Sequence, residues 1–331
     1  MNQTITIFEQ MNELGKARVP FLFVFDFELK KPLIIPLEAV DWQKVRYEIN
    51  GIGPDYGKKE ALPENAFFHA SEADKKHYLQ AFEQLMFHLG RGDTYLINLT
   101  MPVRVETNLS LKQIFEHSQA KYKLWLADEC VVFSPEPFVQ IQNGIISTFP
   151  MKGTIQADQE GTDQQLLEDP KEKAEHYTIV DLLRNDLNSV AVNVRVNSFR
   201  FLQKVETHRG ALWQTSSRIS GELPADFCQH LGDIFQKLLP AGSISGAPKK
   251  RTVELIQAIE KYERGYYTGV MGVFDGQNLD SGVMIRFVEQ TKDGLVYKAG
   301  GGITVNSNVK TEYEELLQKV YLPFTFQSAK P

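Results

Sequence analysis

The apolar residues of the chain alternate between the two-residue period of β-strands and the longer period of helices. Strand patterns bounded by turn residues recur from near the start of the sequence to near its end. The predicted strands span residues 20–27, 31–36, 42–48, 94–105, 131–141, 144–151, 189–201, 267–274, 282–290 and 295–298. The predicted helices span residues 77–91, 171–187, 227–239, 249–262 and 310–320. Helices and strands are therefore mixed along the whole chain.

The predicted strands outnumber the helices that could connect parallel neighbours, so a simple βαβ order fits poorly. We predict an α+β fold with two large, mostly antiparallel β-sheets in a sandwich flanked by helices. No repeat, low-complexity tract or Pro/Ser-rich linker divides the sequence. Residues 1–74 are expected to form an abbreviated β-rich subdomain packed on a main unit at residues 75–325.

Composition narrows the class of protein further. Of the 331 residues, 42% are hydrophobic and 24% charged, which is ordinary for a globular protein. The 36 basic and 42 acidic residues give a net charge of −6, which disfavours nucleic-acid binding. No apolar run is long enough for a membrane span, and the start lacks a secretory leader pattern, so a cytoplasmic protein is expected.

Helix 171–187 places a carboxylate among apolar side chains. Helical spacing puts Glu175 between Ile179 and Leu182 on the apolar stripe. A buried carboxylate needs a partner, because burial without one is costly. Two alternatives follow: a salt bridge to a lysine or arginine, or a metal ligand. Asp186 lies near the same line and suits either a group behind the metal ligand or a network at the helix end.

The last predicted helix, at 310–320, carries Glu312, Glu315 and Lys319 on one face. This pattern fits a solvated stripe of salt bridges. The preceding three glycines at 300–302 permit close backbone approach, and they favour a second interpretation in which their N–H groups form an anion-binding nest. A structural turn or bulge is the alternative for the glycines.

The segment GSISGAPK at 242–249 resembles a phosphate loop only loosely, because its glycine spacing is short and Pro248 stands near the place of the usual lysine. It fits either an ordinary capped helix or a helix start that binds a carboxylate. Arg286 lies within the apolar strand predicted at 282–290 and is expected to pair with a carboxylate. Lys152, in TFPMKGT, is by itself typical of a surface turn.

Taken together, these segments resemble the chorismate-utilising enzymes, and among them the branch that makes 4-amino-4-deoxychorismate. The resemblance covers nearly all of residues 75–325 and implies the chorismate-binding-enzyme fold, with an active site between two sheets. The matching blocks, in the family's order, are GDTYLINLT, FSPEPF, PMKGT, KEKAEHYTIVDLLRNDL, SSRISGEL, PAGSISGAPKKRTVELI, GYYTGVMG, IRFVE and AGGGITVNSNVKTEYEELLQK.

The resemblance also implies a set of site residues. Glu175 and Glu315 match the carboxylates that hold a Mg²⁺ ion, which binds the ring carboxylate of chorismate in the family. Arg286 and Tyr267 match the positions that hold the enolpyruvyl carboxylate. The full set of implied substrate-binding residues is Thr154, Ser243, Gly246, Tyr267, Arg286, Gly300, Gly302 and Lys319.

Lys152 determines the reaction that the resemblance implies. The anthranilate synthases have alanine at this place, whereas lysine resembles the aminodeoxychorismate synthases, in which it attacks C2 of the ring. Ammonia then adds at C4. Glu136 matches the acid that protonates the departing C4 hydroxyl. A nucleophilic lysine must be neutral, so its pKa is expected to fall through burial, Mg²⁺ or nearby cations.

Two positions depart from the family pattern. Leu96 replaces the family's usual glutamine, and relatives that form isochorismate have a water-activating lysine there. An apolar side chain cannot activate water, so isochorismate formation is not expected. Gln214 stands where pyruvate-releasing relatives have a histidine, which fits an enzyme that stops at aminodeoxychorismate.

The resemblance implies a partner, a glutamine amidotransferase subunit that supplies ammonia. Neither Cys130 nor Cys228 lies in a glutaminase-like setting, so either such a partner or dependence on free ammonium is expected. Alternatives are an anthranilate synthase large component or a non-catalytic chorismate-binding subunit.

Overall fold

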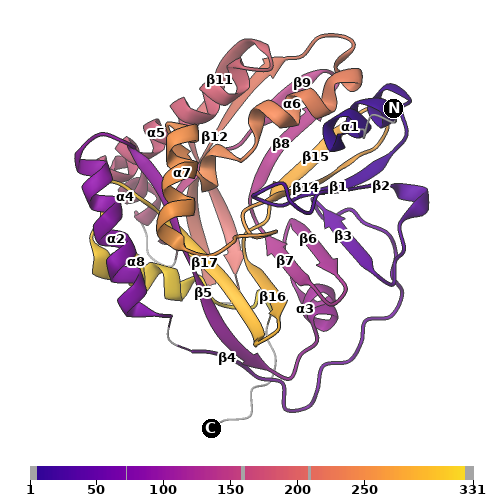
Figure 1. Ribbon diagram of the computed structural model, residues 1–331. Helices are drawn as coiled ribbons and strands as arrows, with labels where there is room; N and C mark the ends of the chain where they lie inside the picture. The colour runs from indigo at the N-terminus through magenta and orange to yellow at the C-terminus, as the bar shows by residue number, and fades with distance from the viewer. Residues whose placement is uncertain (1–5, 72, 158–160, 208–209, 325–331) are drawn as a thin grey trace.

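Two antiparallel β-sheets form the body of the protein, with helices around them (Figure 1). The computed structural model describes residues 6–71, 73–157, 161–207 and 210–324. The predicted α+β fold with two large antiparallel sheets is therefore confirmed.

The first sheet has nine strands. Its order is β10 (Met151–Gln156), β12 (Gly210–Glu222), β9 (Ile145–Thr148), β8 (Pro137–Gln142), β15 (Leu279–Val283), β14 (Val270–Phe274), β1 (Phe21–Phe25) and β2 (Leu33–Pro36), and β11 (Val192–Thr207) pairs with β12. The second sheet has eight strands. Its order is β13 (Gly246–Ala247), β5 (Leu96–Thr107), β17 (Gly294–Ile303), β16 (Phe287–Thr291), β7 (Cys130–Ser134), β6 (Tyr122–Leu126) and β3 (Val45–Ile49), and β4 (Phe68–Ala70) pairs with β5.

The helices group around the sheets as Figure 1 shows, with α2, α5, α7 and α8 together at one side and α3 beside β6 and β7. The α-helices are α1 (Ile7–Lys16), α2 (Lys75–Gly90), α3 (Leu111–His117), α4 (Thr162–Glu168), α5 (Pro170–Asn188), α6 (Leu231–Leu238), α7 (Lys249–Glu260) and α8 (Val309–Gln318). Short 3₁₀ helices are η1 (Leu37–Ala39), η2 (Phe227–His230) and η3 (Gly242–Ile244).

A large apolar cluster is shared by strands of both sheets, including Phe23 of β1 and Val131 of β7. Both side chains are fully buried. The ring of Phe235 in α6 meets Phe23 edge to face at 4.8 Å, which fastens this helix to the first sheet. The site-bearing elements therefore stand on a packed core.

The strands of the first 74 residues belong to both sheets. β1 and β2 extend the first sheet beyond β14, whereas β3 pairs with β6 in the second. Helix α1 was not predicted, although its start carries a capping box between Thr6 and Glu9. The boundary after residue 74 stays a prediction.

The single strand predicted at 282–290 is wrong. β15 ends at Val283 in the first sheet, and β16 begins at Phe287 in the second. Between them Arg286 has a φ of 55°, a left-handed conformation that redirects the chain. The apolar pattern runs through this break because both strands are buried, so the pattern does not reveal the change of sheet.

Candidate functional site

Lys152 and Glu175 meet between β10 and α5. The start of α5 is fixed by Asp169, whose side chain accepts a hydrogen bond from the N–H of Glu172 at 2.9 Å, and by Pro170 in the first turn. Lys152 Nζ lies 2.8 Å from Glu175 Oε2. The side chains are 31% and 16% exposed, so the ion pair is partly shielded from solvent. Of the two alternatives for Glu175, the structure shows the salt bridge, with Lys152 as the partner.

The electrostatic surroundings of Lys152 differ from the expectation. Burial lowers the pKa of Lys152, but the carboxylates of Glu175, Glu315 and Glu172 outweigh burial and hold the pKa above its usual value. The prediction that the pKa of Lys152 is lowered is therefore wrong for the protein without Mg²⁺. Glu172 was missed in the sequence, although its i, i+3 spacing to Glu175 puts both on one helix face.

Lys319 joins the end of α8 to β17. Its Nζ lies 2.7 Å from Glu315 Oε1 and donates a hydrogen bond to the carbonyl of Gly300 at 2.9 Å. Burial lowers the pKa of Lys319, and the nearby charges of Arg286 and Lys152 act in the same direction against Glu315. At the C-terminal end of α8, the predicted stripe of charged side chains therefore lies against β17.

The three glycines at 300–302 lie in the regular strand β17, paired with β5, and none has a positive φ. The expected nest of turned backbone is therefore wrong, and so is the alternative of a turn or bulge. Gly300 allows close approach of β5, because a Cβ there would lie 2.5 Å from the Leu99 carbonyl oxygen, whereas Gly301 and Gly302 leave space. A Cβ at Gly301 would lie 3.4 Å from Lys319 Nζ, and one at Gly302 would lie 3.9 Å from Lys152 Nζ. β17 thus passes beside both ammonium groups with no side chain of its own.

Glu136 and Ser243 form a second contact of the site. Ser243, in η3, donates a hydrogen bond from Oγ to Glu136 Oε1 at 2.6 Å. Burial raises the pKa of Glu136, while Ser243, Arg286 and Lys319 partly oppose the rise. A carboxyl group with a raised pKa retains its proton to a higher pH, as a general acid requires.

Arg286 does not have the predicted carboxylate partner. Within the described ranges, no carboxylate lies within ion-pair distance of its guanidinium. Its Nε instead donates to the Tyr321 hydroxyl at 3.5 Å, and the guanidinium lies 5.6 Å from the centre of that ring. Tyr267 is buried, with its ring 5.8 Å from that of Phe287, and burial raises its pKa.

The remaining predicted positions flank this cluster. Thr154 in β10 pairs across the strands with Gln214 in β12. Gly246 has a φ of 139°, and a Cβ there would lie 1.9 Å from the carbonyl oxygen of Leu96, so only glycine allows β13 to pair with β5. Leu96 also lies close to Gly302, where a Cβ would be 3.2 Å from its Cδ1.

Asp186 forms an ion pair with Lys249 Nζ at 2.9 Å, which ties α5 to the start of α7. Burial raises the pKa of Asp186, and Lys249 opposes the rise. This contact matches the helix-end network considered for the residue.

The sequence profile of the chorismate binding enzyme family matches residues 29–324. The chain belongs to the chorismate binding enzyme family. A protein of Haemophilus influenzae described as an uncharacterized PabA-like protein is 49% identical over 315 residues, covering 95% of each chain. Aminodeoxychorismate synthase component 1 of Klebsiella aerogenes is 34% identical over 262 residues, covering 74% of this chain and 56% of the relative. The resemblance inferred from the sequence is therefore confirmed.

Solved structures support the fold of this chorismate binding enzyme. MenF, the menaquinone-specific isochorismate synthase of Escherichia coli, has a TM-score of 0.72 at 15% identity, covering 94% of this chain and 79% of that chain. Anthranilate synthase component I of Streptococcus pneumoniae has a TM-score of 0.66 at 24% identity, covering 81% of this chain and 61% of that one. At these identities the likeness concerns the fold.

Glu175 and Glu315 are the residues of the set that could hold a divalent cation. Both influence the pKa of Lys152, so the two carboxylates from α5 and α8 act on one place in the site. Among the described residues, no group of three or more His, Cys, Asp and Glu side chains is arranged to hold a metal ion. Two carboxylates from the protein fit Mg²⁺, which keeps waters and takes substrate oxygens as its other ligands. In this structure Glu175 pairs with Lys152 and Glu315 pairs with Lys319.

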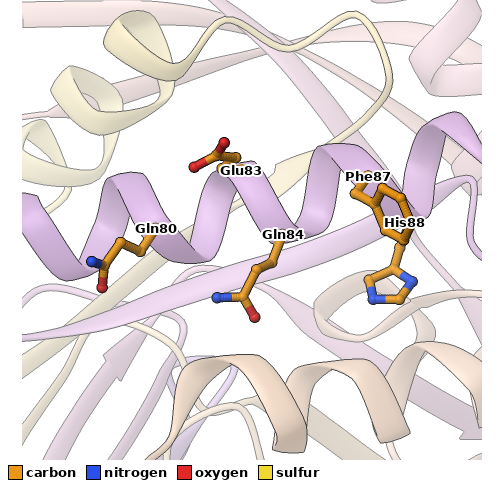
Figure 2. Close-up of a pocket in the computed structure, with 5 residues that line it drawn as sticks. All are labelled: Gln80, Glu83, Gln84, Phe87 and His88. Atoms are coloured by element: carbon orange, nitrogen blue, oxygen red, sulfur yellow. The ribbon is translucent and has the colours of Figure 1, made fainter.

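A separate pocket lies on α2 (Figure 2). Its lining residues are Gln80, Glu83, Gln84, Phe87 and His88. None of the predicted site residues lines it, so it is not part of the candidate site. Across the described part of the chain, the search for a helix long and apolar enough to cross a membrane finds none.

Proposed function

We propose that this chorismate binding enzyme aminates chorismate at C4 with ammonia, producing 4-amino-4-deoxychorismate for para-aminobenzoate and folate synthesis. The observation that carries the proposal is the position of Lys152, which points from β10 to Glu175 and lies beside the bare backbone of Gly302. A lysine amine in a partly closed site is a suitable nucleophile once it has lost its proton.

In the proposed reaction, the neutral amine of Lys152 attacks C2 of the ring and the double bonds shift. The C–O bond at C4 breaks, and Glu136 gives the departing hydroxyl a proton, so that water leaves. Ammonia forms a bond to C4, the double bonds shift back, and the bond from C2 to Lys152 breaks. The protons lost by the two amines restore Glu136 and the lysine, so the net change is chorismate plus ammonia to product plus water.

The other residues of the set have binding roles in this proposal. Arg286 and Tyr267 hold the enolpyruvyl carboxylate, and Lys319 lies beside the glycines at 300–302 where the substrate's carboxylates would approach. Glu175 and Glu315 would hold Mg²⁺. Bound there, the ion would supply positive charge for the ring carboxylate, and it would compete with Lys152 for Glu175 and with Lys319 for Glu315.

The proposed ammonia source is a glutamine amidotransferase subunit. Two features support it: the relative from Klebsiella aerogenes is a component 1, and Cys130 and Cys228 are both buried in this chain. Burial raises the pKa of each thiol, which disfavours the thiolate that a glutaminase needs.

Product identification tests the proposal. Purified protein is incubated with chorismate, Mg²⁺ and ammonium, and the products are separated and identified by mass spectrometry and NMR, which locates the new amine. We expect 4-amino-4-deoxychorismate, and no product without ammonium. Anthranilate with pyruvate would indicate an anthranilate synthase component, and intact chorismate at every ammonium concentration would favour a binding subunit.

A further inference from the structure

Arg264 is a fully buried arginine in the turn that follows α7, with 1% of its side chain exposed. Each of its five N–H groups has an acceptor. Nε donates to Glu260 Oε2 at 2.8 Å, Nη2 donates to Glu260 Oε1 at 2.7 Å and to the Asn98 carbonyl at 2.7 Å, and Nη1 donates to the Ile244 carbonyl at 2.9 Å and to Thr268 Oγ1 at 3.3 Å. One planar group therefore joins four separate segments of the chain.

Three of these segments adjoin the candidate site. Ile244 follows Ser243 in η3, and Thr268 follows Tyr267. Asn98 of β5 pairs with Gly302 of β17. Three of the acceptors thus belong to residues that directly follow, or pair across the strands with, a residue of the site, although Arg264 itself was absent from every motif considered in the sequence.

The partner of Arg264 is held as firmly as Arg264 itself. Glu260 is 1% exposed, and its Oε1 also accepts hydrogen bonds from the Thr100 N–H at 2.8 Å and from the Thr100 hydroxyl at 3.0 Å. The guanidinium lies 4.6 Å from the centre of the Phe27 ring. The Glu260 carboxylate and the Phe27 ring hold the guanidinium in one orientation, and in this orientation Nη1 points to the Ile244 carbonyl.

We propose that Arg264 is a positioning residue, which holds η3 through the Ile244 carbonyl so that the Ser243 hydroxyl reaches Glu136. The inference rests on the proposed function for the role of Glu136 as an acid. Lysine cannot replace this arginine. The guanidinium reaches its acceptors through three separate nitrogens, whereas all three N–H groups of a lysine lie on a single nitrogen.

The consequence is measurable at Glu136. The Ser243 hydroxyl lowers the pKa of Glu136, and Arg286 and Lys319 also face this carboxyl group and lower it. Tyr267 faces it as well. R264K keeps the positive charge and substitutes none of these groups. Comparison with S243A then shows whether a change in the titration of Glu136 comes through the Ser243 contact, because Arg264 also holds Thr268 next to Tyr267.

The experiment is a titration of Glu136 by NMR in protein labelled with ¹³C at the glutamate carboxyl carbon, with E136Q to assign the signal. We expect R264K to raise the pKa of Glu136 in the same direction as S243A, and the double variant R264K/S243A to show no further rise. R251K is the matched control, because Arg251 on α7 is exposed and pairs with the exposed Glu254. It should leave the pKa and the melting temperature unchanged.

A second variant separates positioning from stability. E260L/R264M replaces the buried pair by apolar side chains of similar volume, a change that is often neutral for folding, and it still removes the donor to Ile244. It should also raise the pKa of Glu136. The proposal is overturned if the folded variants keep the wild-type pKa while S243A changes it, if S243A itself has no effect, or if both Arg264 variants fail to fold, which would show a role in the whole fold.

The titration needs no turnover. If the wild-type enzyme forms no aminated product but the pKa of Glu136 still responds to R264K, the proposed function fails and the positioning role stands.

Discussion

The ammonium group of Lys152 lies 2.8 Å from the carboxylate of Glu175, so the proposed nucleophile is paired with a proposed metal ligand. This pairing explains why the pKa of Lys152 is raised despite burial. Loss of the proton from Lys152 and occupation of Glu175 by a cation are therefore coupled events in the proposed mechanism. The coupling means that the effects of substitutions at the two residues should not be additive.

Replacement of Lys152 should abolish amination without unfolding the protein. K152A removes the nucleophile, and we expect kcat to fall by about three orders of magnitude or more. K250A, at an exposed lysine on α7, is the control and should keep wild-type kcat. Steady-state kinetics with ammonium gives the rates, and mass spectrometry of the quenched wild-type reaction should find an adduct on the peptide that contains Lys152. Wild-type turnover by K152A would contradict the mechanism.

Replacement of Glu175 or Glu315 should weaken Mg²⁺ binding. Loss of even an outer-shell partner typically costs about 10–100-fold in metal affinity, so loss of a carboxylate ligand should cost about 100-fold. Calorimetric titration of Mg²⁺ into E175Q and E315Q, with chorismate present and ammonium absent, measures this without turnover. E314Q is the control, because Glu314 is exposed on the same helix as Glu315. Its affinity for Mg²⁺ should match that of the wild type. Unchanged affinity in both test variants would remove these residues from the metal site.

The raised pKa of Glu136 predicts how stability depends on pH. Burial raises this pKa above its ordinary value of 4.5, so the folded protein favours the protonated carboxyl group. The stabilising contribution of Glu136 is present below pH 4.5 and is lost as the pH rises through the raised value. E136Q is neutral at every pH. Urea unfolding between about pH 4 and 8 should therefore show the wild type losing stability relative to E136Q as the pH rises.

The same residue should set the alkaline limb of activity. If Glu136 donates a proton, kcat should fall as the pH passes above its pKa, and E136Q should be slow at every pH, by about 100-fold or more. E254Q, in an exposed pair with Arg251, should keep the wild-type pH profile. A pH profile of kcat with the same alkaline limb in E136Q would assign that limb to another group.

The sequence predicts the sandwich well because alternating apolar residues reflect burial directly. Local spacing predicts that Glu312, Glu315 and Lys319 share one face along α8, whose C-cap is Lys319. The roles of these side chains in a site come from the family resemblance and stay predictions. Features that depend on tertiary contacts cannot be predicted from the sequence pattern. The sheet change at Arg286 lies inside a continuous apolar run, and the Ser243–Glu136 contact joins residues 107 positions apart.

The absence of a side chain at Gly301 should matter for substrate rather than for folding. Its φ is not in the left-handed region, so alanine can adopt the backbone conformation. A Cβ there would lie 3.4 Å from Lys319 Nζ and 3.7 Å from Glu312 Oε2, which are ordinary contact distances, so G301A should melt close to the wild type. The methyl group would occupy the space where, in the proposed mechanism, a substrate carboxylate approaches Lys319.

We therefore expect G301A to raise the KM for chorismate by roughly tenfold, which corresponds to about 1.4 kcal/mol. G90A is the matched control, since Gly90 at the end of α2 has no heavy atom within 4 Å of the added Cβ and its φ is also outside the left-handed region. Its KM should be unchanged. Equal KM values in G301A and the wild type would mean that chorismate does not approach this face of β17, because an added methyl group beside the Lys319 amine could not be passed without cost.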